Sequence, residues 1–223
     1  MNKKLIWLIG GMGSGKSTQR RLLCNAFRET EPKEIKGNLT DDAEYMFTSF
    51  GKTISCIGKV KQEHNGDISM CDGLDSVFGS LKKLGGLHSV DVALQHSDIV
   101  VLEGSQTSPS WGELLKSTIE RYGAEFHLVH LYMTYEENFN RVRQRQYDKL
   151  KKDGGAMFIN DHKEHHLTDR VIESLIGKCR QFNNCYDKLF PLTYINKVKI
   201  LCGNKTEEEV FEDIIQGCFA NDI

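Results

Sequence analysis

The stretch GGMGSGKS, residues 10–17, decides how the rest of the chain is interpreted. It follows a short apolar run at residues 4–9 and precedes a helical pattern over residues 18–30. The spacing matches G-x-x-x-x-G-K-[ST] between a strand and a helix, which is the context that a triphosphate-binding loop requires. Glycines let successive backbone N–H groups surround a phosphate, and the N-terminus of the following helix adds positive potential. We therefore expect a strand, a phosphate-binding loop and a helix at the start of the chain.

This loop predicts individual roles as well as a ligand class. Lys16 is expected to reach the β- and γ-phosphates, and the Ser17 hydroxyl is expected to ligate Mg²⁺. The residues expected to bind the nucleotide are Gly11, Met12, Gly13, Ser14, Gly15, Lys16, Ser17 and Thr18. The sequence therefore predicts a protein that uses ATP and Mg²⁺.

Three further apolar runs, at residues 99–102, 126–133 and 197–202, are each followed by a helical pattern. Capping boxes at Thr134-x-x-Glu137 and Thr206-x-x-Glu209 mark two helix starts. Strands that alternate with helices indicate an α/β fold, with a mostly parallel sheet flanked by helices. Residues 45–60 and the Asn65-Gly66 turn signal break this rhythm and predict a small antiparallel insertion near residues 45–70. A long helix is expected over residues 168–190.

The composition bounds the class of protein. With 223 residues, 39% of them hydrophobic and 27% charged, the chain fits a single domain over residues 1–223. No apolar run approaches the length of a membrane span, and the seven cysteines form no C-x-x-C pair. We expect reduced thiols and a cytoplasmic location. Net charge is only −2, but residues 1–36 and 141–152 are rich in Lys and Arg, which indicates one electropositive face or simply solvated helix surfaces.

Four side chains outside the loop are candidates for the chemistry. Glu103 ends an apolar strand, where it could orient Mg²⁺ waters or the acceptor, or simply leave the sheet as a polar residue. Arg141 and Arg145 are four residues apart on one helix face, so they could clamp a transferring phosphoryl group or form a solvated basic face. Asp72 could accept the proton of an acceptor hydroxyl, whereas Asp75 is better explained as a helix N-cap.

Three classes of protein use a loop of this kind: switch GTPases, motor ATPases and kinases. The segment Asn204-Lys205-Thr206-Glu207 approaches the guanine-reading pattern N-K-x-D but ends in Glu, and Thr206 is better explained as a helix cap. Motor ATPases need a longer chain. The size therefore favours a kinase.

With the loop, Glu103 and the Arg141/Arg145 helix in place, the chain resembles the P-loop nucleoside, nucleotide and polynucleotide kinases over about residues 4–220. Within that superfamily, four short segments resemble bacteriophage kinases that phosphorylate 5-hydroxymethyluracil bases in DNA. These segments are FGK at 50–52, CIGK at 56–59, CDGLD at 71–75 and VLEG at 101–104. The resemblance implies a P-loop kinase fold, ATP and Mg²⁺ as cofactors and a hydroxymethylated base in DNA as acceptor.

The distribution of arginines bears on the acceptor. No arginine lies between Arg28 and Arg121, although monophosphate kinases usually grip the acceptor phosphate with arginines in that interval. A hydroxyl acceptor is therefore favoured, with the 5-hydroxymethyl group of DNA first. Tyr45, Phe47 or Phe50 could stack on an extruded base, although core packing explains most of them. The alternatives are a deoxynucleoside monophosphate kinase and, from another class, an ATP-dependent switch or DNA-binding module. The oligomeric state is not indicated.

Overall fold

A computed structural model describes residues 2–60, 77, 85–104, 110–152, 177, 179–189 and 192–220. The helices and strands within these ranges are, in chain order, β1 (Lys4–Gly10), α1 (Lys16–Phe27), β2 (Lys33–Thr40), β3 (Ala43–Ser49), β4 (Ile54–Cys56), α3 (Gly85–His96), β5 (Ile99–Glu103), α4 (Ser110–Tyr122), β6 (Glu125–Tyr132), α5 (Tyr135–Lys152), α7 (Cys179–Leu189), β7 (Ile195–Leu201) and α8 (Glu207–Phe219).

The strands form one seven-stranded sheet in the order β2-β3-β4-β5-β1-β6-β7. The five strands from β4 to β7 along this order run parallel, and β2 and β3 are antiparallel additions at one edge. β1 is central: Leu5 lies beside Val100 on β5 and beside Phe126 on β6. The expected α/β class, with a mostly parallel sheet flanked by helices, is confirmed.

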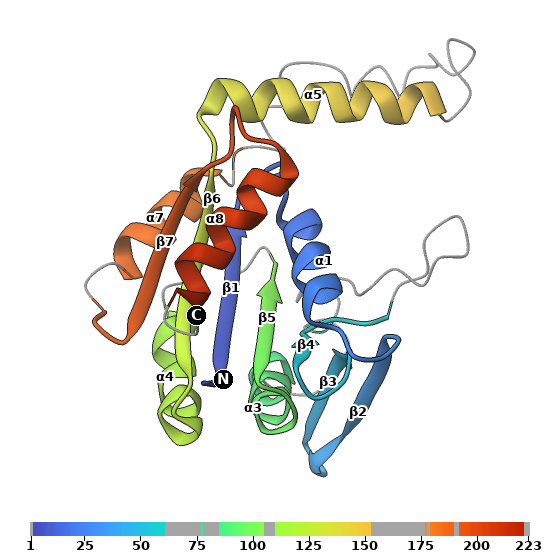
Figure 1. The fold of residues 1–223 in the computed structure, drawn as a ribbon, viewed down its shortest axis with the longest axis vertical. Helices are drawn as coiled ribbons and strands as arrows, with labels where there is room; N and C mark the ends of the chain where they lie inside the picture. The colour runs from blue at the N-terminus through green and yellow to red at the C-terminus, as the bar shows by residue number, and fades with distance from the viewer. Residues whose placement is uncertain are drawn as a thin grey trace.

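Both faces of the sheet are covered, which explains why residues 5–9 of β1 are an unbroken apolar run (Figure 1). Leu5, Trp7 and Ile9 pack on one side with apolar residues of α3, α4 and α7. Ile6 and Leu8 point to the other side and pack with residues of α1 and α8. Because β1 also runs parallel to β5 and β6, residues 10–17 follow it at the C-terminal edge of the sheet.

The antiparallel part differs in position from the sequence prediction. The hairpin joins β2 to β3 through Asp41 and Asp42, and β3 then pairs with the short strand β4. The antiparallel strands thus occupy residues 33–56 rather than residues 45–70, and the Asn65-Gly66 signal lies outside the described residues. β2 escaped prediction because it is a mostly exposed edge strand with few apolar residues.

Both predicted capping boxes are confirmed. Thr206 accepts a hydrogen bond from the Glu209 N–H, and the Glu209 carboxylate accepts from the Thr206 N–H, which starts α8. Thr134 and Glu137 make the same reciprocal bonds before α5. Of the long helix expected over residues 168–190, the structure describes α7. In Figure 1, α5 crosses the top of the molecule and extends beyond the sheet.

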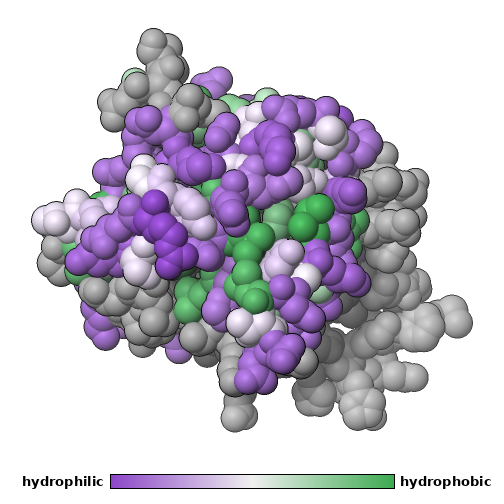
Figure 2. All heavy atoms as spheres, turned by 90° about the horizontal axis from the view of Figure 1, so that it is seen from below, coloured by the Kyte–Doolittle hydropathy of each residue, from purple (hydrophilic) through white to green (hydrophobic). Residues whose placement is uncertain are grey.

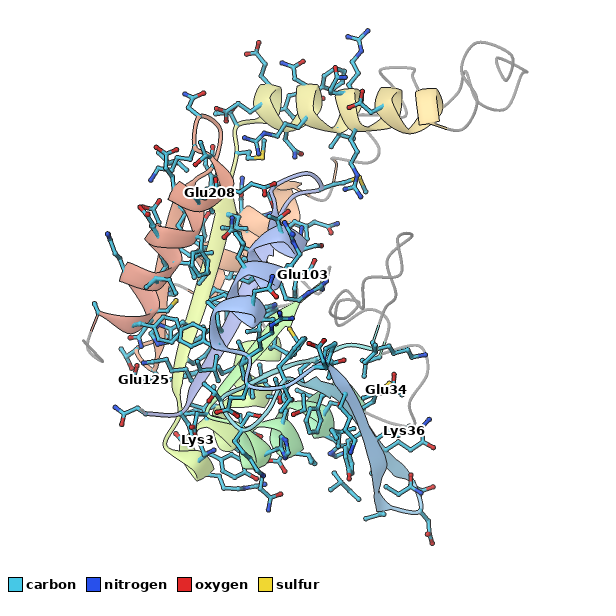
Figure 3. The ribbon with its side chains drawn as sticks, turned by 45° about the vertical axis from the view of Figure 1, so that its right-hand side comes forward. Lys3, Glu34, Lys36, Glu103, Glu125 and Glu208 are labelled. Carbon is cyan, nitrogen blue, oxygen red and sulfur yellow. The ribbon has the colours of Figure 1, made fainter. Side chains whose placement is uncertain are left out.

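Figures 2 and 3 show how polar groups are distributed on the fold. The face seen from below in Figure 2 is mostly hydrophilic, with only a narrow group of hydrophobic residues near its centre. In Figure 3, Lys3 and Glu125 lie low on the sheet, and Glu103 lies above both of them. None of the helices that the structure describes is both long and apolar enough to cross a membrane. Cys24, Cys56, Cys185, Cys202 and Cys218 are buried, and none of these five forms a disulfide bond.

Candidate functional site

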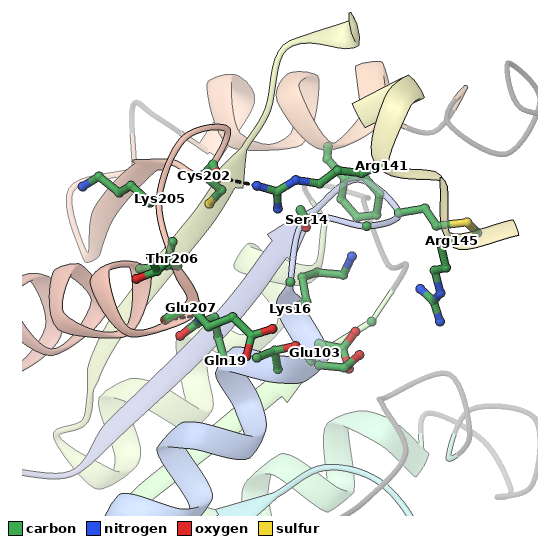
Figure 4. A pocket seen from close by; sticks show the side chains of 18 residues that line it. Ser14, Lys16, Gln19, Glu103, Arg141, Arg145, Cys202, Lys205, Thr206 and Glu207 are labelled. Atoms are coloured by element: carbon green, nitrogen blue, oxygen red, sulfur yellow. Dashed lines mark hydrogen bonds between the residues drawn. The ribbon is translucent and has the colours of Figure 1, made fainter. Parts of the chain in front are cut away.

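A cavity of about 710 Å³ opens at the C-terminal edge of the sheet, where β1 and β5 end (Figure 4). Such edges are where open α/β sheets bind ligands. Five parts of the chain contribute to its lining: the loop after β1 with the first residues of α1, the end of β5, helix α5, helix α7 and the connection from β7 to α8. The lining residues with polar side chains are Ser14, Lys16, Ser17, Thr18, Gln19, Glu103, Arg141, Arg145, Lys205, Thr206 and Glu207.

The glycine-rich loop folds tightly back on itself. Gly13 and Gly15 have φ angles of 81° and 90°, in the left-handed region that side chains with a Cβ disfavour. The Ser14 N–H donates to the Gly11 carbonyl at 3.2 Å, and α1 begins directly after Gly15. The N-terminus of α1 therefore faces the cavity and supplies positive potential there.

Lys16 lies across the mouth of this loop. Its Nζ donates to the carbonyls of Gly10 at 2.8 Å and Gly11 at 3.0 Å. It also lies 5.4 Å from the centre of the Phe182 ring, which α7 contributes to the cavity. Both carbonyls are neutral acceptors, so an anionic oxygen placed in the loop would compete effectively for this ammonium group.

Glu103 and Ser17 meet at the base of the cavity. The Ser17 hydroxyl donates to Glu103 Oε2 at 3.4 Å, and the Arg20 guanidinium donates to the same oxygen. Arg20 and Glu103 are only 7% and 8% exposed, so this ion pair is largely shielded from water. A buried carboxylate of this kind needs a compensating charge, which Arg20 provides.

The donor set at this point fits Mg²⁺. Magnesium favours oxygen ligands and is held in proteins by one or two side chains together with substrate phosphates and water. The Ser17 hydroxyl and the Glu103 carboxylate are oxygen donors that lie next to each other, beside the loop that would hold the phosphates. These two residues, which the sequence assigned to the metal, are therefore brought together by the fold.

Arg141 and Arg145 both line the cavity, whereas Arg143, between them, is exposed and does not. Arg141 Nη2 donates to the carbonyls of Cys202 at 2.8 Å and Gly203 at 3.0 Å, so it connects α5 to the chain after β7. In Figure 4 the Arg145 side chain points from α5 toward the region of Lys16 and Glu103. The two arginines thus share a face of α5 but have different surroundings.

The connection from β7 to α8 forms the remaining side. Burial raises the pKa of the Cys202 thiol to about 11, which keeps it protonated at neutral pH. A hydrogen bond to Asp213 raises the pKa of Lys205, so this cavity-lining amine stays charged. Gln19 Nε2 donates to the Glu207 carbonyl at 2.9 Å and thereby connects α1 to the start of α8.

Three residues of the site escaped the sequence analysis. Arg20 could have been found, because it lies three residues after Ser17 and four after Lys16 on the same helix face. Phe182 lies within the helix expected over residues 168–190, but no local pattern indicated that it lines a cavity. Asn138, which is 1% exposed and donates to the Met12 carbonyl, connects α5 to the loop across 126 positions of sequence. No local pattern reports such a long-range contact.

The outcome differs for the other predicted residues. Asp72 and Asp75 lie outside the residues that the structure describes. Phe47 and Phe50 are fully buried in the core, so they are not available to stack on a base. Comparison of the sequence with protein-family models gives no match, and comparison with curated proteins gives none either. The functional argument therefore depends on the geometry of the cavity and on the sequence patterns.

Proposed function

We propose that this chain is a P-loop kinase, which transfers the γ-phosphate of ATP in the presence of Mg²⁺. The observation that carries the proposal is the convergence of Lys16, Ser17, Glu103 and Arg145 on one cavity at the end of β1 and β5. A cation, two oxygen donors for a metal and a guanidinium are the groups that phosphoryl transfer requires, because catalysis there is mainly positioning and charge stabilisation.

Each residue has a separate task in this mechanism. Lys16 exchanges its contacts with the Gly10 and Gly11 carbonyls for oxygens of the β- and γ-phosphates. The backbone N–H groups of residues 11–18 and the N-terminus of α1 hold the remaining phosphate oxygens. Ser17 and Glu103 would hold Mg²⁺, which would supply positive charge to compensate the phosphates when bound. Arg145 stabilises charge on the transferring group.

For the acceptor we propose a hydroxyl, with the 5-hydroxymethyl group of hydroxymethyluracil in DNA first. The support is the absence of arginine between Arg28 and Arg121 and the resemblance of four short segments to phage DNA kinases. A hydroxyl nucleophile needs a base to accept its proton, and Asp72 is the residue assigned to this role. A base within a duplex must also leave the stack to reach the cavity.

A labelled-transfer screen tests this proposal. The protein is incubated with Mg²⁺ and γ-labelled ATP, and with deoxynucleosides, deoxynucleoside monophosphates, or matched DNA duplexes that contain thymine or hydroxymethyluracil. We expect label on the hydroxymethylated duplex alone, none with Lys16→Ala and less with Asp72→Asn. Because phosphate contacts make DNA binding salt-dependent, we also expect transfer to weaken steeply between about 50 and 200 mM salt.

The other outcomes separate the alternatives. Label on a monophosphate, with none on hydroxymethylated DNA, would identify a deoxynucleoside monophosphate kinase and overturn the assigned acceptor. Release of free phosphate with no labelled acceptor would indicate a switch ATPase and overturn the kinase assignment.

A further inference from the structure

Arg20 occupies an unusual place for a charged side chain. It belongs to α1, yet only 7% of it is exposed, and its guanidinium ends at the carboxylate of Glu103 on the neighbouring strand β5. The contact joins the helix that follows the glycine-rich loop to the strand end that borders the same cavity. Burying a charge in this way is costly unless the partner is fixed and well oriented.

Arg20 contacts one particular oxygen of the Glu103 carboxylate, and this contact determines how it orients that carboxylate. Both hydrogen bonds described for the Glu103 carboxylate, from Arg20 and from Ser17, go to Oε2. The carboxylate is therefore fixed at one oxygen, and Oε1 is the oxygen that remains to accept from a metal-bound water. Ser17, Arg20 and Glu103 thus share one hydrogen-bonded arrangement at the end of β5, beside the glycine-rich loop.

We propose that Arg20 is a positioning residue for the magnesium site: it acts through Glu103 and sets the affinity of the cavity for the metal of the metal–nucleotide complex. This inference rests on the proposed function, since it assumes that the cavity binds a nucleotide with its metal. Removal of groups that orient a metal ligand typically lowers metal affinity by about 10- to 100-fold. Arg20 is not among the residues that line the cavity, so binding of the metal-free nucleotide should be nearly unaffected.

A double-mutant cycle on metal binding provides the test. The probes are a non-hydrolysable ATP analogue, titrated in EDTA, and Mn²⁺, whose EPR signal reports its binding to the protein–analogue complex. The variants are Arg20→Met, Glu103→Gln and the double substitution. Arg28→Gln serves as the matched control, because Arg28 follows the last residue of the same helix and is exposed.

We expect Arg20→Met to weaken Mn²⁺ binding about 10- to 100-fold, with analogue binding in EDTA and the Arg28→Gln control within about twofold of the unaltered protein. In the Glu103→Gln background the same Arg20 substitution should change Mn²⁺ affinity by less than about twofold, because the residue through which it acts is already altered. Arg20→Lys should recover part of the loss, since it keeps the charge but not the planar fork.

Three results would overturn the inference. One is unchanged Mn²⁺ affinity in Arg20→Met. Another is an equal loss in both Glu103 backgrounds, which would mean that Arg20 acts independently of the carboxylate. Failure of the unaltered protein to bind the analogue would remove the proposed function as well, whereas the first two results leave it standing. If thermal melting shows that Arg20→Met does not fold, the same comparison is made with Arg20→Gln in the two backgrounds, and the same outcomes decide.

Discussion

Two sides of the cavity are held in place by different interactions. The inner side consists of Lys16, Ser17, Arg20 and Glu103, which extend from α1 and β5 and lie against the sheet. Its central ion pair is more than nine-tenths buried. The outer side consists of Arg141 and Arg145 on α5, a helix that crosses the top of the molecule and extends past it (Figure 1).

The outer side depends on a few polar contacts. Asn138 donates to the Met12 carbonyl and Arg141 donates to two carbonyls after β7, and Arg145 itself is exposed. The comparison shows that the core of the sheet positions the inner side, whereas backbone carbonyls position the outer side. Substitutions on the inner side should therefore remove charge from an assembled site, and those on the outer side should also change how α5 lies over it.

The largest expected effect belongs to the inner side. Lys16→Ala should lower phosphoryl transfer by several orders of magnitude, because the ammonium group compensates charge on the β- and γ-phosphates. The melting transition should stay normal, since loop substitutions of this kind change stability little. Steady-state kinetics and thermal melting measure the two quantities. Near-normal turnover would contradict the assignment of the loop.

On the outer side, Arg145→Ala should lower kcat by roughly 10²- to 10⁴-fold, through lost stabilisation of transition-state charge. Arg141→Ala should lower it over the same range and should also raise KM, because two carbonyls that fix α5 lose their donor. Arg143→Ala is the matched control: two residues along a helix rotate the side chain by about 200°, away from the cavity. Equal losses at all three positions would refute the distinction between the two faces of α5.

A fall in pH should lower the stability of the fold by an intermediate amount, through a buried histidine on β6, the strand that leads into α5. His130 is 2% exposed, and its ring centre lies 5.0 Å from that of Tyr186 on α7. Burial, and secondarily the charge of Lys199, lowers the pKa of His130 to about 4, although Asp187 opposes this. The folded chain therefore keeps the imidazole neutral at pH 5. In the unfolded chain the same imidazole takes up a proton once the pH falls below the ordinary pKa of histidine, about 6.5.

The sign of the pH effect follows from this difference. Because the unfolded state binds more protons between pH 6.5 and pH 4, stability should fall as pH falls through that window, by on the order of 1–2 kcal/mol between pH 7.5 and pH 5. Urea unfolding at the two pH values measures the change. His130→Phe should remove the part of this change that His130 contributes, which the difference between the two proteins measures. An unchanged pH dependence in this variant would show that His130 is not the cause.

The smallest expected effects concern the two helix caps. Thr206→Ala should lower the free energy of unfolding by about 1 kcal/mol, because α8 loses a capping bond and packs into the core. Thr134→Ala removes the equivalent bond from α5 and should cost less globally, but it should allow the first turn of α5 to fray. Hydrogen exchange distinguishes the two. Equal global losses would indicate that α5 is as firmly docked as α8.

The sequence predicted the inner side better than the outer side, for physical reasons. β1, the glycine-rich loop and α1 are contiguous, and each has a local signature: an apolar run, glycines at left-handed positions and a helical period. Glu103 followed from its place at the end of an apolar strand. Arg20 was not predicted as the partner of Glu103, because this pairing depends on how α1 packs against the sheet.

Long-range and edge features were the least predictable. The spacing of Arg141 and Arg145 placed them on one face, but nothing local revealed that Arg141 would donate to carbonyls 61 and 62 positions further along the chain. β2 was missed because an edge strand exposed to water lacks the apolar alternation by which strands are recognised. The acceptor side of the mechanism, with Asp72, stays a prediction.

The most direct test of the account is a crystal structure of the protein with Mg²⁺ and a non-hydrolysable ATP analogue. We expect the triphosphate in the loop of residues 10–17, with Lys16 released from the Gly10 and Gly11 carbonyls onto the phosphates. Magnesium should lie on the Ser17 hydroxyl, with Glu103 still held by Arg20. A nucleotide bound elsewhere, or a loop in which Lys16 keeps both carbonyls while the analogue is bound, would contradict the account.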